Sequence, residues 1–437
     1  MQFSSSMLGP YAERAMLAPP GLEGKVTEVL GMLIAGSARD AAVGDLYRIE
    51  SRDDEIIAEV VALRGNDALL VPYGNLSGVR VGDRMVPQGG ASAIDVSDAM
   101  LGRMINVMGK PMDGGPALPR GTRRLVYGEP LAPAERAMVD QRLPLGVRCL
   151  DAFVPAARGQ RLGIFAGPGV GKSVLMGMIA RSAQADVTVM GLVGERGREV
   201  GHFATQILGP EGMQRSVLVV ATSDRPPSER VRAAFVATTI AEYFRDQGKS
   251  VLLFVDSLTR FAMAQREVGL AIGEPPTTKG YPPSTFAMMP RLLERAAPDL
   301  HGGSITGIYT VLVEGDDMTD PVGDAAKGLL DGHITLSRSL ANRGHYPAVD
   351  VLQSLSRVDT EVSSNEELQA ARKVRGWLAQ LEDSKDLVSV GAYKPGSDPL
   401  LDQALKKGPL IDRFLQQNIH EIANPVETRN TLLALGR

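Results

Sequence analysis

The sequence predicts an α/β core that is preceded by a small β-barrel and followed by a helical domain. Three observations lead to this fold class: short, evenly spaced strand patterns over residues 22–87, apolar runs that alternate with helical periods over residues 159–315, and a charged, helical pattern after residue 360. We therefore expect four parts, which are a loosely ordered segment (1–21), a barrel that serves assembly (22–92), the core with its linker (93–360) and a helical domain (361–437).

The composition is that of a soluble globular chain. Of the 437 residues, 44% are hydrophobic and 22% charged, and the net charge is −4. This charge gives no general attraction to nucleic acid or anionic lipid. Cys149 is the only cysteine, which excludes an internal disulfide, and five scattered histidines offer no zinc-ligand pair. The N-terminus lacks the pattern of a secretory signal and no run of about 18 apolar residues occurs, so we expect a cytoplasmic protein.

The barrel is predicted from five short runs with turn residues between them. They lie at Lys25–Leu30, Leu46–Glu50, Glu55–Leu63, Ala68–Pro72 and Arg84–Pro87. Aromatic residues are few in this part, and no stripe of Lys or Arg lies between them. A barrel that binds nucleic acid needs stacking platforms and a basic groove, so packing and assembly are the favoured role.

The core follows a Gly- and Pro-rich linker, in which we expect helical turns at Asp98–Val107 and an exposed loop at Gly109–Pro119. Buried strands with helical crossovers form an open, mainly parallel sheet, and its functional residues gather at the carboxyl ends of the strands. The expected strands are Arg161–Ala166, Val187–Val193, Ser216–Thr222, Val251–Val255 and, closing the series, Ile305–Val313. The expected helices are Lys172–Ala183, Glu199–Leu208, Ser228–Gln247 and Phe261–Ile272 in the core, then Glu366–Leu381, Pro399–Lys407, Leu410–Gln417 and Pro425–Leu435.

A glycine-rich loop follows the first strand of the core. Residues Ala166–Ser173 read AGPGVGKS, and an apolar helical pattern comes next. Glycines let backbone N–H groups converge on a phosphate, and the helix presents the positive end of its dipole. Lys172 can reach the β- and γ-phosphates of a nucleotide, and the Ser173 hydroxyl can hold Mg²⁺. The predicted binding residues are Gly167, Pro168, Gly169, Val170, Gly171, Lys172, Ser173 and Val174, and Ala166 stands where the strict motif has glycine.

Two carboxylates follow other buried strands of the core. Asp256 ends an apolar strand, where it either supports the shell of a Mg²⁺ ion or caps the next helix. Glu195 follows the strand at 187–193, and a carboxylate at that edge can position and polarise the attacking water. Arg196 can orient Glu195 or contact phosphate, and the alternative is that residues 196–199 are a solvated charged run.

Two further candidates lie beyond the last expected strand. Tyr346 can supply an aromatic face for a base, although a single Tyr more often packs in a core. Arg357 can neutralise charge that grows on a γ-phosphate, although an isolated Arg is usually part of a surface ion pair.

Taken together, these residues resemble the catalytic subunits of the rotary-ATPase superfamily, and within it the ATPases of type III export. The matching stretches are Phe165–Ser173, Gly194–Val200, Ser216–Asp224, Asp256–Phe261, Gly273–Ser284, Glu314–Asp320 and Gly344–Arg357. The strings at Phe261–Glu267, Val388–Tyr393 and Gly396–Pro399 favour the flagellar branch, whereas Ser216–Pro226 is more similar to the virulence-secretion branch.

The resemblance implies a RecA-like core that hydrolyses ATP with Mg²⁺. It implies phosphate and Mg²⁺ binding by Lys172 and Ser173, Mg²⁺ support by Asp256, the catalytic carboxylate at Glu195, adenine packing on Tyr346 completed by Tyr393, and Arg357 as an arginine finger in the neighbouring subunit's site. It also implies a homohexamer at the inner-membrane export apparatus. Its partners would be a central stalk protein, a peripheral regulatory protein, the membrane proteins of the export gate, and export substrates with their chaperones, without nucleic acid.

Three alternatives remain open on the sequence. A β-type catalytic subunit of a rotary ATP synthase is disfavoured because the C-terminal region lacks the acidic segment with which such subunits engage their rotor. A non-catalytic scaffold subunit is disfavoured by Glu195, for which it has no use. A hexameric RNA translocase is disfavoured by the poor aromatic and basic content of residues 22–87.

Overall fold

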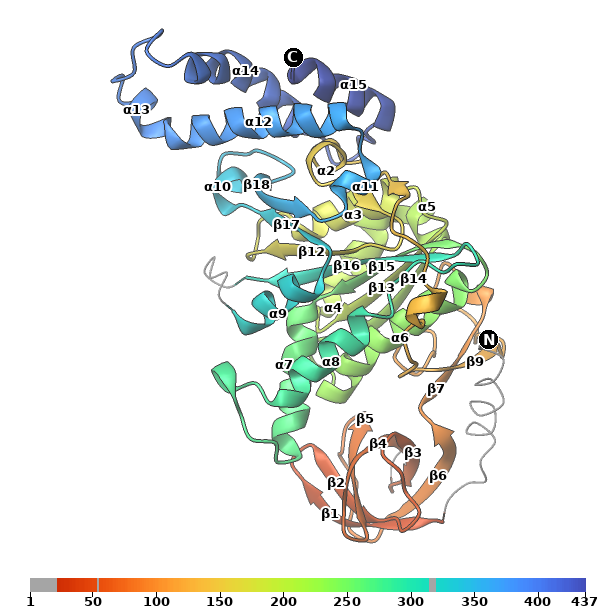
Figure 1. The fold of residues 1–437 in the computed structure, drawn as a ribbon. Coiled ribbons are helices and arrows are strands. Elements are labelled where there is room, and N and C mark those ends of the chain that lie inside the picture. The colour runs from red at the N-terminus through yellow and green to blue at the C-terminus, as the bar shows by residue number, and fades with distance from the viewer. Residues whose placement is uncertain (1–21, 53–54, 314–319) are drawn as a thin grey trace.

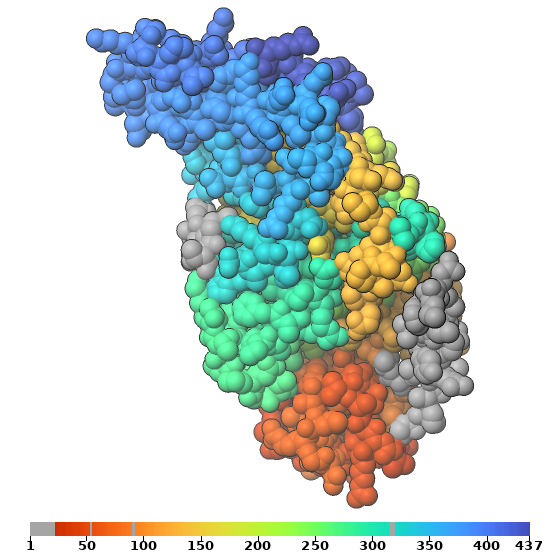
Figure 2. Space-filling view, viewed as in Figure 1, coloured from red at the N-terminus to blue at the C-terminus, as the bar shows by residue number. Residues whose placement is uncertain are grey.

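The chain is divided into three stacked parts (Figure 1). The computed structural model describes residues 22–52, 55–313 and 320–437, so the predicted N-terminal segment 1–21 and most of the matching stretch Glu314–Asp320 lie outside the described residues. A barrel lies at one end, the α/β layer in the middle and the C-terminal helices at the other end, and the space-filling view shows one elongated body (Figure 2). Within the described residues, no helix is both long and apolar enough to cross a membrane.

Six strands close the barrel in the order β1-β2-β5-β4-β3-β6. The sequence prediction missed β2, because its outward side is apolar as well. Leu33 of β2 and Val71 of β5 pack against Val268 of the core, so the run does not alternate between apolar and polar residues. The strands are β1 (Gly24–Leu30), β2 (Leu33–Ser37), β3 (Asp45–Glu50), β4 (Glu55–Arg64), β5 (Asp67–Tyr73) and β6 (Arg84–Ala91).

A buried polar cluster joins the barrel to the core. Arg232, which is 0% exposed, donates from Nε to the Val107 carbonyl at 3.0 Å and from Nη1 to the Ser92 hydroxyl. Its Nη1 lies 3.8 Å from Glu59 Oε2 of β4, and its guanidinium lies 5.0 Å from the centre of the Tyr73 ring. The Tyr73 hydroxyl donates to Glu59. This cluster fixes the barrel against α6 (Pro227–Arg245), the helix that carries Arg232.

The central sheet has eight strands in the order β18-β17-β12-β16-β15-β13-β14-β8. All neighbours are parallel except β18, which is antiparallel to β17. The expected series of strands ended with Ile305–Val313, but two later strands, β17 and β18, follow it in the chain and extend the sheet beyond β12. The strands are β8 (Met104–Ile105), β12 (Arg161–Ala166), β13 (Val187–Val193), β14 (Ser216–Ala221), β15 (Ser250–Asp256), β16 (Ser304–Leu312), β17 (Gly332–Leu336) and β18 (Val349–Ser356).

The predicted helical turns at Asp98–Val107 are also largely wrong. Only Asp98–Met100 forms a 3₁₀ turn, and β8 follows it and pairs with β14 at the sheet edge. The other short elements outside the central sheet are β7 (Ala93–Val96), β9 (Thr122–Leu125), β10 (Arg142–Leu143), β11 (Ala156–Ala157), the 3₁₀ turns Pro133–Glu135 and Thr278–Gly280, α2 (Arg148–Phe153), α10 (Arg338–Asn342) and α11 (Asp359–Val362).

Helices cover both faces of the sheet, and each face has its own hydrophobic core. One face packs against α3 (Lys172–Ser182) and the C-terminal helices, and the other packs against α6, α7 and α8. The expected helix at Glu199–Leu208 begins earlier and is irregular, as α4 (Gly197–His202) continues into a π-helix (Phe203–Leu208) and then α5 (Gly209–Gln214). The remaining core helices are α7 (Leu258–Ala271), α8 (Pro283–Leu293) and α9 (Pro321–Leu329).

The C-terminal part is a layer of helices on the core. Ser364 caps α12 (Asn365–Asp383), where its hydroxyl accepts from the Glu367 N–H and the Glu367 carboxylate accepts from the Ser364 N–H. The two helices expected at 399–407 and 410–417 are a single helix, α14 (Pro399–Leu415), that contains Pro409. Packing of its buried face outweighs the helix-breaking effect of that proline. The other helices are α13 (Lys385–Ser389) and α15 (Pro425–Leu435).

Candidate functional site

The glycine-rich loop joins the carboxyl end of β12 to the start of α3. Gly169 and Gly171 have φ values of 78° and 95°, which glycine adopts without strain. Gly171 is the residue before the first turn of α3, so the free N–H groups of this turn lie at the loop. Ser173 is exposed and Lys172 is partly exposed at the same place. The predicted loop residues therefore lie where the free N–H groups of the first turn of α3 are available, which suits phosphate.

The structure brings both predicted carboxylates to Lys172. Asp256 is the last residue of β15, and one of its oxygens accepts from the Lys172 ammonium and from the Thr310 hydroxyl. Glu195 follows β13, and its Oε1 lies 3.6 Å from Lys172 Nζ. Both carboxylates are largely buried, with 4% of Asp256 and 8% of Glu195 exposed. Three charged groups from three separate segments therefore meet at the carboxyl edge of the sheet.

Arg260 is a member of this cluster that the sequence prediction missed. Its Nη1 lies 3.5 Å from Glu195 Oε2 and donates to the Gly194 carbonyl. Arg260 lies in the first turn of α7, which begins directly after Asp256 and is capped by Ser257. The sequence does hint at this role, because Arg260 follows closely after a buried strand. Residues that start a helix after such a strand lie at the carboxyl edge of the sheet, where the glycine-rich loop also lies.

The environment of Glu195 raises the pKa of its carboxyl group. Burial is the largest cause, and the nearby Asp256 charge adds to it, while the charges of Lys172 and Arg260 act in the opposite direction. A carboxylate with a raised pKa is a stronger base than an exposed one, which suits proton transfer from water near neutral pH.

Tyr346 lines a cavity next to the loop. The cavity has a volume of about 930 Å³. A Cβ placed on Gly171 would lie 3.7 Å from the Tyr346 ring, which is 47% exposed. The remaining walls include Gly169 of the loop, Val174 and Met178 of α3, Arg148 of α2, and Gln416 and Gln417 after α14. An aromatic, half-open wall beside a phosphate-type loop has the form of a site for the base of a nucleotide.

Two predicted residues lie away from this cluster. The Arg196 side chain is 71% exposed and its Nη1 lies 3.6 Å from Glu199 Oε1, as in the alternative of a solvated charged run. The Tyr393 hydroxyl donates to Asp402 Oδ1 at 2.8 Å and to the Asp398 carbonyl at 3.1 Å, at the start of α14. The structure therefore does not bring either of them to the loop within this chain.

Arg357 lies at the opposite edge of the sheet from the loop. It follows β18, and its N–H donates to the Asp331 carbonyl at 2.9 Å. The Asp331 N–H in turn donates to the carbonyl of Arg161, the first residue of β12. The loop begins at the other end of that six-residue strand, about 17 Å away at about 3.3 Å per residue. Arg357 therefore cannot reach the loop of its own chain.

Comparisons with known proteins agree with this architecture. Three family models match: "ATP synthase alpha/beta family, beta-barrel domain" at residues 26–89, "ATP synthase alpha/beta family, nucleotide-binding domain" at 146–356, and "T3SS EscN ATPase C-terminal domain" at 363–434. The flagellum-specific ATP synthase of Treponema pallidum (strain Nichols) is 50% identical over 94% of this chain and 92% of its own length.

Two solved structures of EscN from the type III secretion system of enteropathogenic E. coli also match at 44% identity, with 95% of this chain and 100% of theirs covered. The assembled ATPase gives a TM-score of 0.90, and the assembled ATPase in complex with its central stalk EscO gives 0.88.

The fold and the loop thus define a nucleotide-binding α/β protein with an N-terminal barrel and C-terminal helices. The chain belongs to the ATP synthase alpha/beta family, in the group that contains flagellum-specific ATP synthases and type III secretion ATPases. The predicted fold class and the predicted family resemblance are confirmed.

Proposed function

We propose that this chain is a Mg²⁺-dependent ATPase that energises protein export through a flagellar type III apparatus. The observation that carries this proposal is the meeting of Lys172, Asp256 and Glu195 beside a glycine-rich loop, in a chain of the ATP synthase alpha/beta family. A scaffold subunit that only binds nucleotide gains nothing from the buried Glu195, whereas hydrolysis needs a group that activates water.

In the proposed reaction, ATP and water give ADP and phosphate. The loop N–H groups and Lys172 bind the β- and γ-phosphates, and Tyr346 packs on the adenine. Glu195 orients the attacking water and accepts its proton, and Arg260 holds the Glu195 carboxylate toward the loop. The raised pKa of Glu195 supports its assignment as the base.

The residues at the loop also fit a magnesium ion. The Ser173 hydroxyl and the Asp256 carboxylate are hard oxygen donors, which is the chemistry that Mg²⁺ prefers. Among the described residues no group of three or more His, Cys, Asp or Glu side chains could hold a metal ion by itself. Phosphate oxygens and water would supply the other ligands of a Mg²⁺ ion here, and the ion would neutralise charge on the phosphates when bound.

Arg357 is proposed to act in the site of a neighbouring subunit. Its position at the far edge of the sheet supports this, because it is too far from its own loop. In a ring, the glycine-rich loop of each subunit can face Arg357 of the next subunit, so that every nucleotide site receives an arginine from its neighbour. EscN, which is 44% identical to this chain, has been solved as an assembled ATPase, and we propose a homohexamer here.

The partners are proposed from the relatives. EscN forms a complex with its central stalk EscO, so we propose an equivalent stalk protein for this chain. A peripheral regulatory protein, the membrane proteins of an export gate, and export substrates with their chaperones complete the proposed set. The chain would then work in the cytoplasm, at the membrane but not within it.

The enzymatic proposal is tested by phosphate release from ATP by the purified chain. We expect Mg²⁺-dependent hydrolysis that EDTA abolishes, with Lys172→Ala as the inactive control. Hydrolysis that is absent in assembled rings, or equal in wild type and Lys172→Ala, would refute the proposal.

Export through a virulence apparatus is the second candidate. The match of residues 363–434 to a C-terminal domain named for EscN favours it. Affinity isolation from the native cell decides between the two, because flagellar components support the first candidate and needle-complex components support the second.

A further inference from the structure

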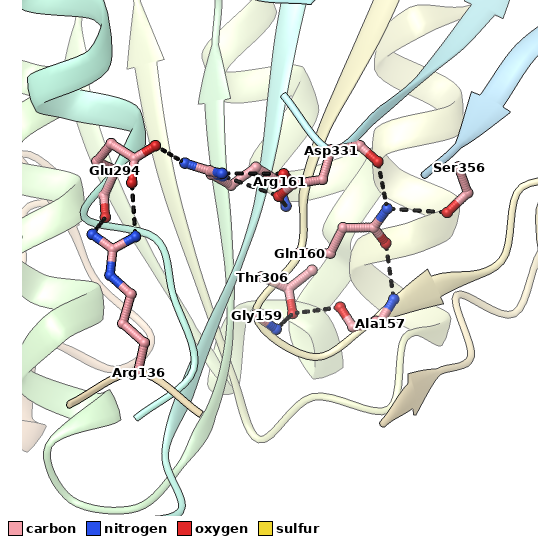
Figure 3. Close-up of polar contacts among 9 residues, drawn as sticks. All are labelled: Arg136, Ala157, Gly159, Gln160, Arg161, Glu294, Thr306, Asp331 and Ser356. Carbon is pink, nitrogen blue, oxygen red and sulfur yellow. Dashed lines mark hydrogen bonds and ion pairs between the residues drawn. The ribbon is translucent and has the colours of Figure 1, made fainter. Parts of the chain in front are cut away.

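The backbone around Arg357 is held by a partly buried polar network at the amino-terminal edge of the sheet (Figure 3). Four of its members are Gln160, Arg161, Asp331 and Ser356. Two lie next to Arg357, since Ser356 precedes it and the Asp331 carbonyl accepts its N–H. Nothing in the hydrolytic cluster at the other edge of the sheet accounts for these contacts.

Asp331 is bound to Arg161 through both its main chain and its side chain. The Asp331 carboxylate accepts from Nε and Nη2 of Arg161 at 3.0 and 3.1 Å, and Oδ2 also accepts from the Arg161 N–H at 3.0 Å. The Asp331 N–H donates to the Arg161 carbonyl at 2.8 Å. Bidentate, charge-assisted pairs of this kind fix orientation as well as distance. The Asp331 carbonyl, which receives Arg357, is therefore placed by β12.

Gln160 ties together the two chain segments that flank this point. Its side chain is 0% exposed, and Nε2 donates to the Asp331 carbonyl and to the Ser356 hydroxyl, both at 3.1 Å. Its Oε1 accepts from the Ala157 N–H at 2.9 Å, so both ends of the amide are engaged. The Ser356 hydroxyl donates onward to the Pro155 carbonyl at 2.8 Å. A single amide thus joins the start of β17 to the end of β18.

The network continues through charged pairs into the linker. Glu294 pairs with Arg161, and its other oxygen lies 2.7 Å from Nη1 of Arg136. Burial lowers the pKa of Arg161, but the Asp331 and Glu294 carboxylates raise it by more, so that the guanidinium stays charged. These further pairs hold the Arg161 side chain, and through it Asp331, in a fixed position.

The side chain of Arg357 is left exposed above this support. Within the described part of the chain, its one side-chain hydrogen bond runs from Nη2 to the Lys327 carbonyl at 3.1 Å, near the end of α9. A fixed main chain with an exposed guanidinium is the arrangement needed by a group that must reach a partner across an interface. Catalytic geometry tolerates errors of only about 0.5 Å.

We infer that Gln160 and Asp331 are positioning residues that aim Arg357 at the γ-phosphate of the neighbouring subunit. The inference rests on the proposed function of Arg357 and extends it to two residues that contact no nucleotide. It makes a specific demand: a defect at either residue impairs the site of the neighbour and leaves the site of its own chain intact.

The first test is steady-state hydrolysis by Gln160→Leu, which removes both amide donors and keeps the approximate volume. We expect kcat to fall about tenfold to a hundredfold, because a displacement of about 1 Å costs that much. ATP binding, measured with a fluorescent analogue, should change less than about twofold, because the loop is untouched. Gln160→Glu, which keeps the acceptor and loses the donors, should fail in the same way. A kcat equal to wild type in assembled rings would overturn the inference.

A matched control comes from the pair Arg103–Asp113. The Asp113 carboxylate accepts from Nε and Nη2 of Arg103 at 2.7 and 2.8 Å and from the Met104 N–H at 3.1 Å, which copies the pattern at Asp331. The arginine of each pair is 16% exposed, and the carboxylates are 24% and 29% exposed. Asp331→Asn should lower kcat about tenfold or more, whereas Asp113→Asn should leave it unchanged. Equal losses in both variants would indicate general destabilisation and would overturn the inference.

The second test mixes subunits before ring assembly. Gln160→Leu mixed with Lys172→Ala should regain activity, because some sites then combine an intact loop with a correctly held Arg357. Gln160→Leu mixed with Arg357→Ala should regain none, because every arginine that enters a site is absent or misplaced. The reverse pattern would mean that Gln160 acts on its own loop, which overturns the inference. Failure of Lys172→Ala with Arg357→Ala to recover would instead refute the trans arrangement itself. If Gln160→Leu does not assemble, the same mixtures are made with Asp331→Asn.

Discussion

Removing the buried Arg232 should loosen the barrel from the core in a pH-dependent way. The Arg232→Met variant keeps most of the volume but loses the hydrogen bonds to Val107 and Ser92 and leaves the Glu59 carboxylate without its cation. Breaking a buried charge pair in this way costs about 3–5 kcal/mol when the remaining charge persists. The lost hydrogen bonds alone cost about 1–3 kcal/mol.

The pH dependence follows from the pKa of Glu59. Burial raises this pKa above the ordinary value of 4.5, and the Arg232 charge holds it down. Without Arg232 the native-state pKa rises further, so the variant binds more protons than the wild type between the two pKa values. Its stability therefore falls relative to the wild type as pH rises through that window. We expect the larger loss at pH 8 and the smaller one at pH 5.

Hydrogen exchange of amides in β4 and β5 measures this loss, after correction for the intrinsic exchange rate at each pH. The double variant Glu59→Gln, Arg232→Met is the control, because it carries no carboxylate and should show the same loss at both pH values. A loss in Arg232→Met that is equal at pH 5 and pH 8 would refute the reasoning.

Three further predictions concern the site. Lys172→Ala and Arg357→Ala are each expected to be inactive. In an equal mixture, about one quarter of the interfaces combine both intact residues, so phosphate release should recover to about one quarter of the wild-type rate. No recovery in proven mixed rings would exclude action in trans. Tyr346→Ala should weaken ATP binding about tenfold through lost stacking, while Tyr346→Phe should bind normally by the same fluorescence assay. In Arg260→Gln, the acidic limb of the kcat–pH profile should move to higher pH, because the Arg260 charge lowers the pKa of Glu195; a limb that stays in place or moves to lower pH would exclude Glu195 as the titrating group.

The sequence predicted the parts of the fold in which local pattern and environment agree. The strands that carry the loop, Glu195 and Asp256 are continuous apolar runs because they are buried on both faces, and each begins or ends within one residue of its predicted bounds. The strands β17 and β18 were missed because neither is a continuous apolar run like the earlier core strands. Buried and more exposed positions alternate in both, and β18 lies at the edge of the sheet. The order of strands in the sheet is a tertiary property, so it could not be predicted from the sequence of any single strand.

The site was predictable to the extent that chemistry and strand ends coincide. Lys172, Glu195 and Asp256 were expected together because each lies at or after the carboxyl end of a parallel strand, and the structure places them within one cluster. Arg260 was missed because it lies in the short gap between the predicted strand Val251–Val255 and the predicted helix Phe261–Ile272, and its contact with Glu195 is a tertiary one. Arg357 could be placed at the opposite edge only once β18 was known to be antiparallel to β17.

The central claim is that the cluster at the carboxyl edge hydrolyses ATP with Glu195 as the base. The most direct measurement compares ATP binding and phosphate release in Glu195→Gln and the wild type. The amide keeps the size of the side chain and its place near Lys172 and Arg260 but cannot accept the proton of the attacking water. We predict that Glu195→Gln rings bind ATP normally and release almost no phosphate. Turnover at the wild-type rate in that variant would contradict the claim.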